Sequence, residues 1–100
     1  MGIDSEAWIT KETKAFLDSY KPYLYYWKVS DRFTIGVPDI VGCYEGVFFA
    51  IELKALGKKA DKVQSFTLKQ MQRSGGWTLS TDSIEDVIDF IDEISDYLSL

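Results

Sequence analysis

The stretch from residue 36 to residue 54, GVPDIVGCYEGVFFAIELK, constrains the fold more than any other part of the chain. It has the pattern of two strands joined by a tight turn at Glu45-Gly46. Glycine favours such a turn because it adopts the positive φ that two-residue hairpin loops need. We therefore predict a β-hairpin here, with both strands long enough to cross a small sheet.

The register of this hairpin follows from its turn. With a two-residue loop, Tyr44 pairs with Val47, and counting outward places Asp39 directly opposite Glu52. A four-residue loop gives the same pairing, whereas a three- or five-residue loop would break it. Cross-strand partners point to one face with Cβ atoms ~5 Å apart, and Lys54 shares that face because it lies two residues beyond Glu52. The sequence thus predicts two facing carboxylates beside an ammonium group.

Two facing carboxylates repel each other, and one of them would take up a proton unless a positive charge lay nearby. A divalent cation meets that need, because Mg²⁺ prefers one or two carboxylates together with water and phosphate oxygens. The chain has no histidine, which excludes Ser-His-Asp catalysis and histidine-ligated metals and leaves Mg²⁺ or Mn²⁺. The other interpretation makes Asp39 a turn residue and Glu52 part of a surface ladder. It is disfavoured because Glu52 follows the apolar run 47–51, which is typical of a buried strand.

The same residues carry a resemblance to a known family. Pro38-Asp39, twelve further residues and then the tripeptide 52–54 (Glu-Leu-Lys) resemble the signature of the PD-(D/E)XK nuclease superfamily. Together with Gly36 and Gln64, the pattern is similar to the VRR-NUC branch, whose small standalone members are common among phage proteins. The similarity extends from about residue 6 to residue 87.

This resemblance implies a metal-dependent endonuclease that hydrolyses DNA phosphodiester bonds. Asp39 and Glu52 would hold Mg²⁺, with Mn²⁺ as a substitute, and the Leu53 main-chain carbonyl would join them. Lys54 would stabilise negative charge and orient the attacking water. Gln64 would position that water or a phosphate, although its spacing from Asp61 equally fits a helix capping box.

The resemblance also implies a further acid, a quaternary state and a substrate class. A glutamate of the first helix often approaches the metal in related nucleases. Glu6 matches that position better than Glu12, and a first-turn glutamate favoured by the helix dipole is the other interpretation. Standalone relatives suggest a homodimer acting on branched DNA such as four-way (Holliday) junctions. A catalytically silent DNA-binding or assembly module and a site-specific duplex endonuclease are the alternatives.

Charge is unevenly distributed along the chain. Residues 82–100 hold seven acidic residues and no basic one, so residues 1–81 hold nine acids against eleven bases, although the net charge is −5. The pattern that phosphate binding needs is present as a basic stripe after the hairpin, formed by Lys54, Lys58, Lys59, Lys62, Lys69 and Arg73, although ordinary lysines on a solvated helix face also explain it. The residues expected to contact DNA are Lys28, Arg32, Lys58, Lys59 and Lys62.

The remaining elements follow from periodicity and turn residues. We predict one domain over residues 1–100 with an α/β fold, a small mixed sheet flanked by helices in the order α-β-β-β-α-β-α. The predicted caps are Asp4 or Ser5, Asp61 and Ser83, and Gly75 ends the middle helix. Besides the hairpin, the predicted elements are a helix over 4–20, a strand over 23–30, a helix over 61–74, a strand over 77–80 and a helix over 84–98.

The remaining expectations concern packing and location. Trp27 and the neighbouring tyrosines are expected in the core, with base-stacking platforms as the other interpretation. The middle helix is expected to point inward through Val63, Phe66, Thr67, Gln70 and Met71. The single cysteine, Cys43, excludes an intrachain disulfide and fits a reducing compartment. No apolar run is long enough to span a membrane and the N-terminus does not resemble a secretory signal, so we expect a cytoplasmic protein, in the host cytoplasm if phage-encoded.

Overall fold

The computed structural model describes residues 2, 5–30, 34 and 36–100. The predicted element order α-β-β-β-α-β-α is confirmed, and the sheet is mixed as expected. The elements in chain order are α1 (Glu6–Asp18), β1 (Leu24–Lys28), β2 (Ile40–Tyr44), β3 (Val47–Leu53), α2 (Lys62–Arg73), β4 (Trp77–Thr81) and α3 (Ile84–Leu98).

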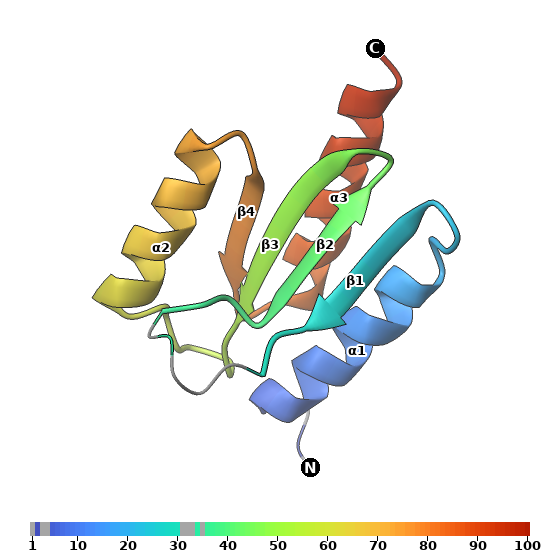
Figure 1. The fold of residues 1–100 in the computed structure, drawn as a ribbon. Coiled ribbons are helices and arrows are strands. Elements are labelled where there is room, and N and C mark those ends of the chain that lie inside the picture. Colours follow the sequence, from blue (N-terminus) through green and yellow to red (C-terminus); the bar gives the residue numbers. More distant parts are fainter. Residues whose placement is uncertain (1, 3–4, 31–33, 35) are drawn as a thin grey trace.

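The four strands form one sheet in the order β1-β2-β3-β4. β1 and β2 pair antiparallel, and so do β2 and β3, whereas β4 runs parallel to β3. Parallel neighbours need a crossover, and α2 supplies it. Figure 1 shows α1 and α3 on one face of the sheet and α2 on the other. This topology brings the carboxyl ends of β3 and β4 to the same edge.

The hairpin has the predicted turn and register. Glu45 has φ 46° and Gly46 has φ 90°, and two successive positive values are the mark of a type I′ turn. Tyr44 pairs with Val47, and the ladder continues to residues 40 and 51. The expectation of a strand from residue 36 is wrong, because β2 begins only at residue 40 and Gly36 lies against α2 instead of pairing in the sheet.

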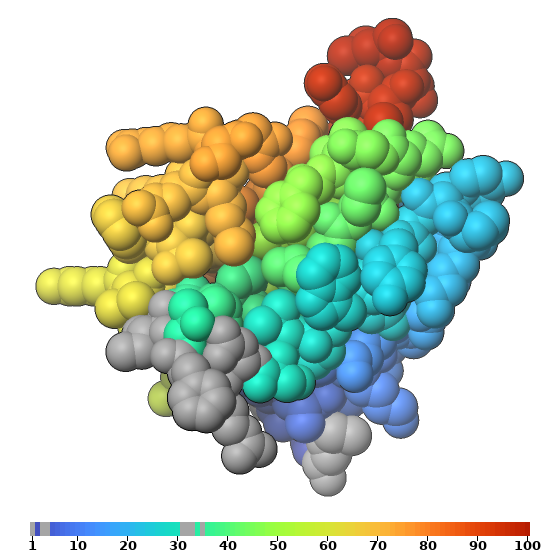
Figure 2. Space-filling view, viewed as in Figure 1, coloured from blue at the N-terminus to red at the C-terminus, as the bar shows by residue number. Residues whose placement is uncertain are grey.

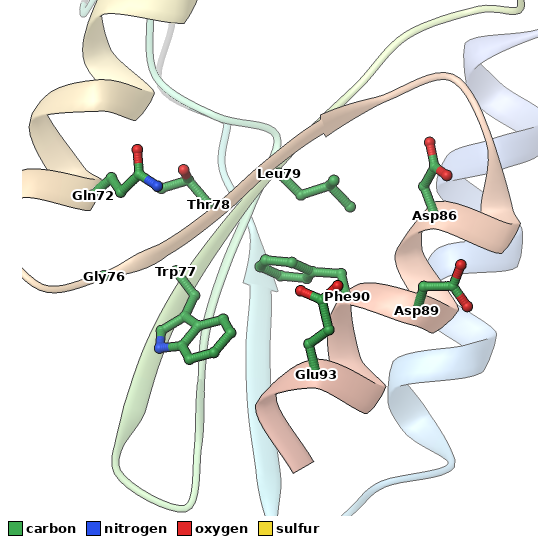
Figure 3. Close-up of a pocket in the computed structure, with 9 residues that line it drawn as sticks. All are labelled: Gln72, Gly76, Trp77, Thr78, Leu79, Asp86, Asp89, Phe90 and Glu93. Atoms are coloured by element: carbon green, nitrogen blue, oxygen red, sulfur yellow. The ribbon is translucent and has the colours of Figure 1, made fainter. Parts of the chain in front are cut away.

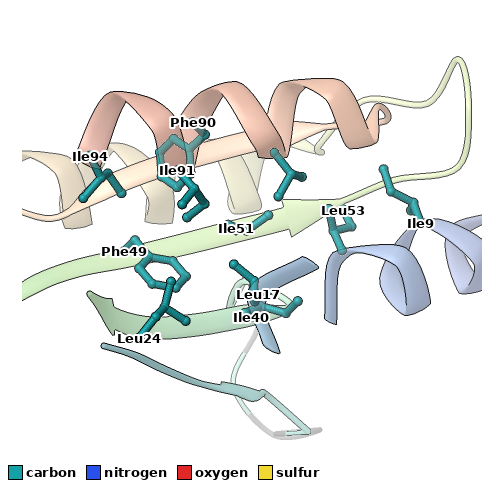
Figure 4. Close-up of a cluster of buried hydrophobic side chains, with 11 residues drawn as sticks. Ile9, Leu17, Leu24, Ile40, Phe49, Ile51, Leu53, Phe90, Ile91 and Ile94 are labelled. Atoms are coloured by element: carbon teal, nitrogen blue, oxygen red, sulfur yellow. The ribbon is translucent and has the colours of Figure 1, made fainter. Parts of the chain in front are cut away.

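The main core lies between the sheet and the pair α1 and α3 (Figure 4). Side chains from β1, β2 and β3 meet apolar residues of both helices there, and full burial of each large side chain contributes about 1.5–3 kcal/mol. The acidic helix α3 covers this core with Val87, Phe90, Ile91 and Ile94. The buried residues of the cluster are Ile9, Leu17, Leu24, Ile40, Phe49, Ile51, Leu53, Val87, Phe90, Ile91 and Ile94.

The opposite face of the sheet has a smaller core, in which Leu68 of α2 packs with Val41 and Ala50. The predicted inward stripe of α2 is wrong for Val63, Phe66 and Gln70, which are exposed. A Cβ on Gly36 would lie 2.7 Å from Val63 Cγ1, so the segment before β2 contacts this side of the helix. The stripe is therefore divided between the sheet, this segment and solvent.

Because α2 packs mainly on β3 and β4, the described residues leave the β1–β2 half of this face largely uncovered, and Figure 2 shows its side chains to the right of the yellow helix. The prediction that Trp27 and its neighbouring tyrosines are buried is wrong for Tyr23, Tyr25 and Trp27, which are all exposed. Tyr26 instead points to the other face, packs against the main core and donates a hydrogen bond to Asp18 Oδ1 at 2.8 Å.

Most predicted helix caps are confirmed. Ser5 Oγ accepts the Trp8 N–H at 3.0 Å, and Gly75 ends α2 with φ 99°. Ser83 occupies the N-cap position of α3, but its hydroxyl donates to Glu85 Oε2 at 2.8 Å in place of a cap bond. Among the described residues, no helix has the length and apolar character needed to cross a membrane.

Candidate active site

Asp39 lies at the start of β2, where two neighbouring strands hold it. Its main-chain carbonyl accepts the Val29 N–H at 2.8 Å, which extends the ladder to β1. Its Oδ2 accepts the Leu53 N–H at 2.7 Å, and the Lys28 ammonium lies 3.5 Å from its Oδ1. The carboxylate is therefore fixed against the end of β3, with one oxygen facing a cation from β1.

Glu52 lies on the next strand, on the same face as Asp39. Its residue exposure is only 1%, and within the described part of the chain its Oε2 has no hydrogen-bond partner. Burial raises the pKa of Glu52 to about 9, and the adjacent Asp39 carboxyl adds to the rise. Since a buried carboxylate needs a partner for its charge, this side chain is electrostatically incomplete.

Lys54 follows Glu52 on the same face, as the alternation of side chains along β3 requires. Its Nζ lies 3.8 Å from Glu52 Oε1, and its charge lowers the pKa of that carboxyl against the larger effect of burial. Its main-chain N–H donates to the Thr81 carbonyl at 3.0 Å, which ties it to the end of β4. The ammonium is thus held beside the carboxylate pair.

The arrangement fits a hard divalent cation. The described residues contain no cluster of three or more His, Cys, Asp or Glu side chains that could form a complete metal cage. Two carboxylates with an unpartnered buried oxygen instead match the partial protein coordination that Mg²⁺ accepts, with water and phosphate oxygens as further ligands. Asp39 and Glu52 would hold the ion, and a contribution from the Leu53 carbonyl stays a prediction.

Glu6 approaches this site from α1. Its negative charge contributes to the raised pKa of Glu52, after burial and the Asp39 carboxyl. Glu6 and Lys28 also line a cavity of about 640 Å³ between α1 and β1. The structure therefore favours Glu6 over Glu12 as the acid nearest the carboxylate pair, while direct metal contact stays a prediction.

Gln64 forms the capping box that its spacing allows. The Asp61 side chain accepts the Gln64 N–H at 2.8 Å, and Gln64 Oε1 accepts the Asp61 N–H at 3.2 Å. The Gln64 side chain is thus engaged at the start of α2, and its amide NH₂ group is the part left to contact water or phosphate. The structural interpretation is confirmed, and the catalytic one stays a prediction.

The expected DNA-contacting residues are dispersed around the site. Lys58 and Lys59 line a cavity of about 420 Å³ near the ends of β3 and β4, together with Asp82 and Asp86. The lysines of the basic stripe therefore lie near the carboxylates of Asp82 and Asp86, although these acids are more than twenty residues away in the sequence. Lys62 is exposed in the first turn of α2. Arg32 lies outside the described residues.

A further cavity, of about 590 Å³, lies on the α3 side of the sheet (Figure 3). Asp86, Asp89 and Glu93 of α3 line it together with Trp77 of β4. Three carboxylates make this cavity unsuitable for a phosphate backbone. The facing carboxylates Asp39 and Glu52, which lie outside this cavity, remain the better candidate for the chemistry.

Sequence reasoning missed two features of the site. Ser80 of β4 pairs with Glu52 in the parallel ladder, so its side chain lies on the same face. Trp27 of β1 is exposed on that face as well. Alternation along residues 23–28 indicates which side chains share a face, but it does not show that α2 leaves this face open.

The comparisons with known proteins agree with this architecture. No family model matches the chain, and no curated protein matches it. A solved structure described as "VRR_NUC domain" superposes with a TM-score of 0.74 and 21% sequence identity, covering 87% of this chain and 94% of the other. The resemblance expected from the sequence is therefore confirmed for the fold. The chain has the fold of a VRR_NUC domain.

Proposed function

We propose that this protein is a metal-dependent endonuclease of the VRR-NUC family that hydrolyses phosphodiester bonds in DNA. The observation that carries the proposal is the buried Glu52 carboxyl, which faces Asp39, lies 3.8 Å from the Lys54 ammonium and has an unpartnered oxygen among the described residues. A purely structural role does not account for a carboxyl kept in this position. The fold likeness to a VRR_NUC domain supports the same conclusion.

The residues of the site have separate tasks in this proposal. Bound Mg²⁺ or Mn²⁺ supplies a water of lowered pKa and neutralises phosphate charge. Asp39 and Glu52 fix the position of that ion, and Glu6 adds negative charge beside them. Lys54 stabilises the charge that develops on the phosphate, because its ammonium is held by the same strand. Gln64 orients water or phosphate through its amide NH₂ group.

The proposed substrate is branched DNA, such as a four-way junction, bound by a homodimer. Lys28, Lys58, Lys59 and Lys62 would contact phosphates as sequence-independent charges. Two copies related by a twofold axis would supply two sites for paired cuts.

The test measures cleavage of linear, flap and four-way substrates with Mg²⁺, Mn²⁺, Ca²⁺ or EDTA. We expect Asp39→Asn and Glu52→Gln to abolish cleavage in Mg²⁺ while DNA binding in Ca²⁺ persists. Wild-type rates from either variant, or equal cleavage in EDTA, would exclude the proposed site. Wild-type binding of all substrates without cleavage of any would favour a silent binding module.

A matched lysine pair separates chemistry from binding. Lys54→Ala should reduce single-turnover cleavage roughly a hundredfold, because it removes a donor at the reacting phosphate. Lys59→Ala should instead weaken binding and lower the salt slope by about one unit, with little effect on the bound rate. If both variants changed only the Kd, Lys54 would be another phosphate contact.

A further inference from the structure

The open half of the sheet carries a row of exposed aromatic side chains that leads to the carboxylate pair. Tyr25 and Trp27 alternate with inward residues on β1, and their side chains are 67% and 51% exposed. Their rings lie side by side, with centroids 6.1 Å apart and planes inclined by 47°. Tyr25 pairs with Cys43 of β2, and Cys43 pairs in turn with Phe48 of β3, which is also exposed. We call Tyr25, Trp27 and Phe48 the aromatic platform.

The strand register connects this platform to the candidate active site. Trp27 pairs with Val41, and Asp39 lies two residues further along the same face. Diagonal neighbours of this kind have Cα atoms about 7–8 Å apart, within reach of an indole ring. The Val29 N–H bond to the Asp39 carbonyl shows that the ladder is continuous at this point. Trp27 is therefore the platform residue nearest the carboxylates.

We propose that the aromatic platform binds unpaired nucleobases, which stack on Trp27 and Tyr25 while the adjoining backbone passes the carboxylates. The inference rests on the proposed nuclease function and narrows its substrate to DNA with unstacked bases next to the cut. Exposed aromatic side chains bind single strands without sequence preference because every base has a flat π-face that can stack on them, and nearby positive charge holds the backbone. Here Lys28 follows Trp27, and its ammonium lies 3.5 Å from Asp39 Oδ1 at the end of the platform.

Charge favours a nucleic acid as the occupant. On this face β2 places the uncharged residues Val41 and Cys43 beside the rings, and the ammonium of Lys28 lies at the end near Asp39. The acidic side chains of α3 lie on the other side of the sheet, where Asp89 and Glu93 line the cavity of Figure 3. A second protein copy seated on Trp27 would cover the neighbouring Asp39 and close the site to DNA.

The experiment compares single strands of equal length and charge that contain thymine bases or abasic sites. Binding is measured in Ca²⁺ by fluorescence anisotropy, so that cleavage does not intervene. We expect wild-type protein to bind the thymine strand at least about tenfold more tightly than the abasic one. Trp27→Ala should remove this preference without changing abasic binding or the salt slope, and Trp27→Phe should keep most of it.

Two controls use groups that the chain already has. Tyr97→Ala removes an exposed aromatic residue of α3 that packs against Trp77 of β4, and it should leave the preference intact. Cys43, the single cysteine, is exposed beside Tyr25. Its alkylation should slow when thymine strands bind but not when abasic strands bind. If Trp27→Ala lowers thermal stability, Tyr25→Ala repeats the test.

The outcomes separate this inference from the proposed function. An unchanged thymine preference in both Trp27→Ala and Tyr25→Ala would overturn the stacking role, even if Mg²⁺-dependent cleavage is normal. Loss of a dimer in light scattering on Trp27→Ala, with the preference unchanged, would assign the platform to a second copy. Absence of cleavage by wild-type protein would refute the nuclease function, while the thymine preference would still decide the platform.

Discussion

Replacing Glu52 by glutamine should stabilise the metal-free protein although it abolishes cleavage. The side chain is almost completely buried, its Oε2 has no partner among the described residues, and a second carboxylate faces it. Folding must therefore either bury an incompletely compensated charge or bind a proton. Glutamine keeps the shape, carries no charge, and can donate its amide hydrogens to Asp39.

The expected gain in the free energy of unfolding follows from the burial of the Glu52 side chain. An unsatisfied buried polar group costs about 1–3 kcal/mol. The Lys54 ammonium at 3.8 Å offsets part of this cost for the wild type, so the lower half of the range is the better expectation. In a protein of this length, a gain of about 1 kcal/mol raises the Tm by roughly 4 °C. Glu52→Gln should thus raise the Tm in EDTA by several degrees.

Divalent cations should make the wild type more stable than Glu52→Gln, the reverse of the order expected in EDTA. A ligand at a hundred times its Kd stabilises the folded state by about 2.7 kcal/mol. Wild-type protein should gain stability with increasing Mg²⁺, whereas Glu52→Gln, which lacks one of the two carboxylates, should gain little. The assay is urea unfolding monitored by circular dichroism, in EDTA and across a Mg²⁺ titration.

The control is Glu93→Gln, which changes the same functional groups on the exposed side of α3. It should change neither the metal-free stability nor the response to Mg²⁺. Suppose Glu52→Gln proved less stable than wild type in EDTA by more than about 1 kcal/mol, with Glu93→Gln neutral. The Glu52 carboxyl would then be well satisfied in the metal-free fold, and the electrostatic argument for a cation site would fail.

Two further predictions concern stability alone. Gly36→Ala should cost more than about 1 kcal/mol in urea unfolding, because its φ is +85° and a Cβ would lie 2.7 Å from Val63 Cγ1. The control is Gly57→Ala, at φ +83°, where no described atom outside the chain neighbours would lie within 4 Å of the added Cβ, so it measures the backbone cost alone. Equal losses of unfolding free energy in the two variants would show that the contact of residue 36 with α2 is unimportant. Burial, and then the hydrogen bond to the Asp18 carboxylate, raise the pKa of Tyr26 to about 12. The contribution of the Tyr26 hydroxyl to stability is therefore fully present below about pH 10 and is lost as the pH rises through 12. Tyr26→Phe should flatten the plot of unfolding free energy against pH between these values. An unchanged plot would contradict the assignment of this pH dependence to Tyr26.

The features predicted correctly depend on short stretches of chain. The hairpin register follows from the positive φ at Gly46 and from the two-residue period of a strand, so counting alone places Asp39 opposite Glu52. The capping box of Asp61 and Gln64 is a contact between residues three apart. Such features are decided by covalent geometry and local hydrogen bonds, which neighbouring residues determine by themselves.

The features that were missed or mispredicted depend on contacts between distant segments. Lys28 reaches Asp39 because β1 pairs with β2, and Glu6 influences Glu52 because α1 packs beneath the sheet. The alternation along residues 23–28 shows that odd and even side chains face opposite ways. Which face is covered depends on where α2 packs, and that position is set by the crossover between β3 and β4. Tertiary packing alone therefore decided that Trp27 lies exposed beside the carboxylates.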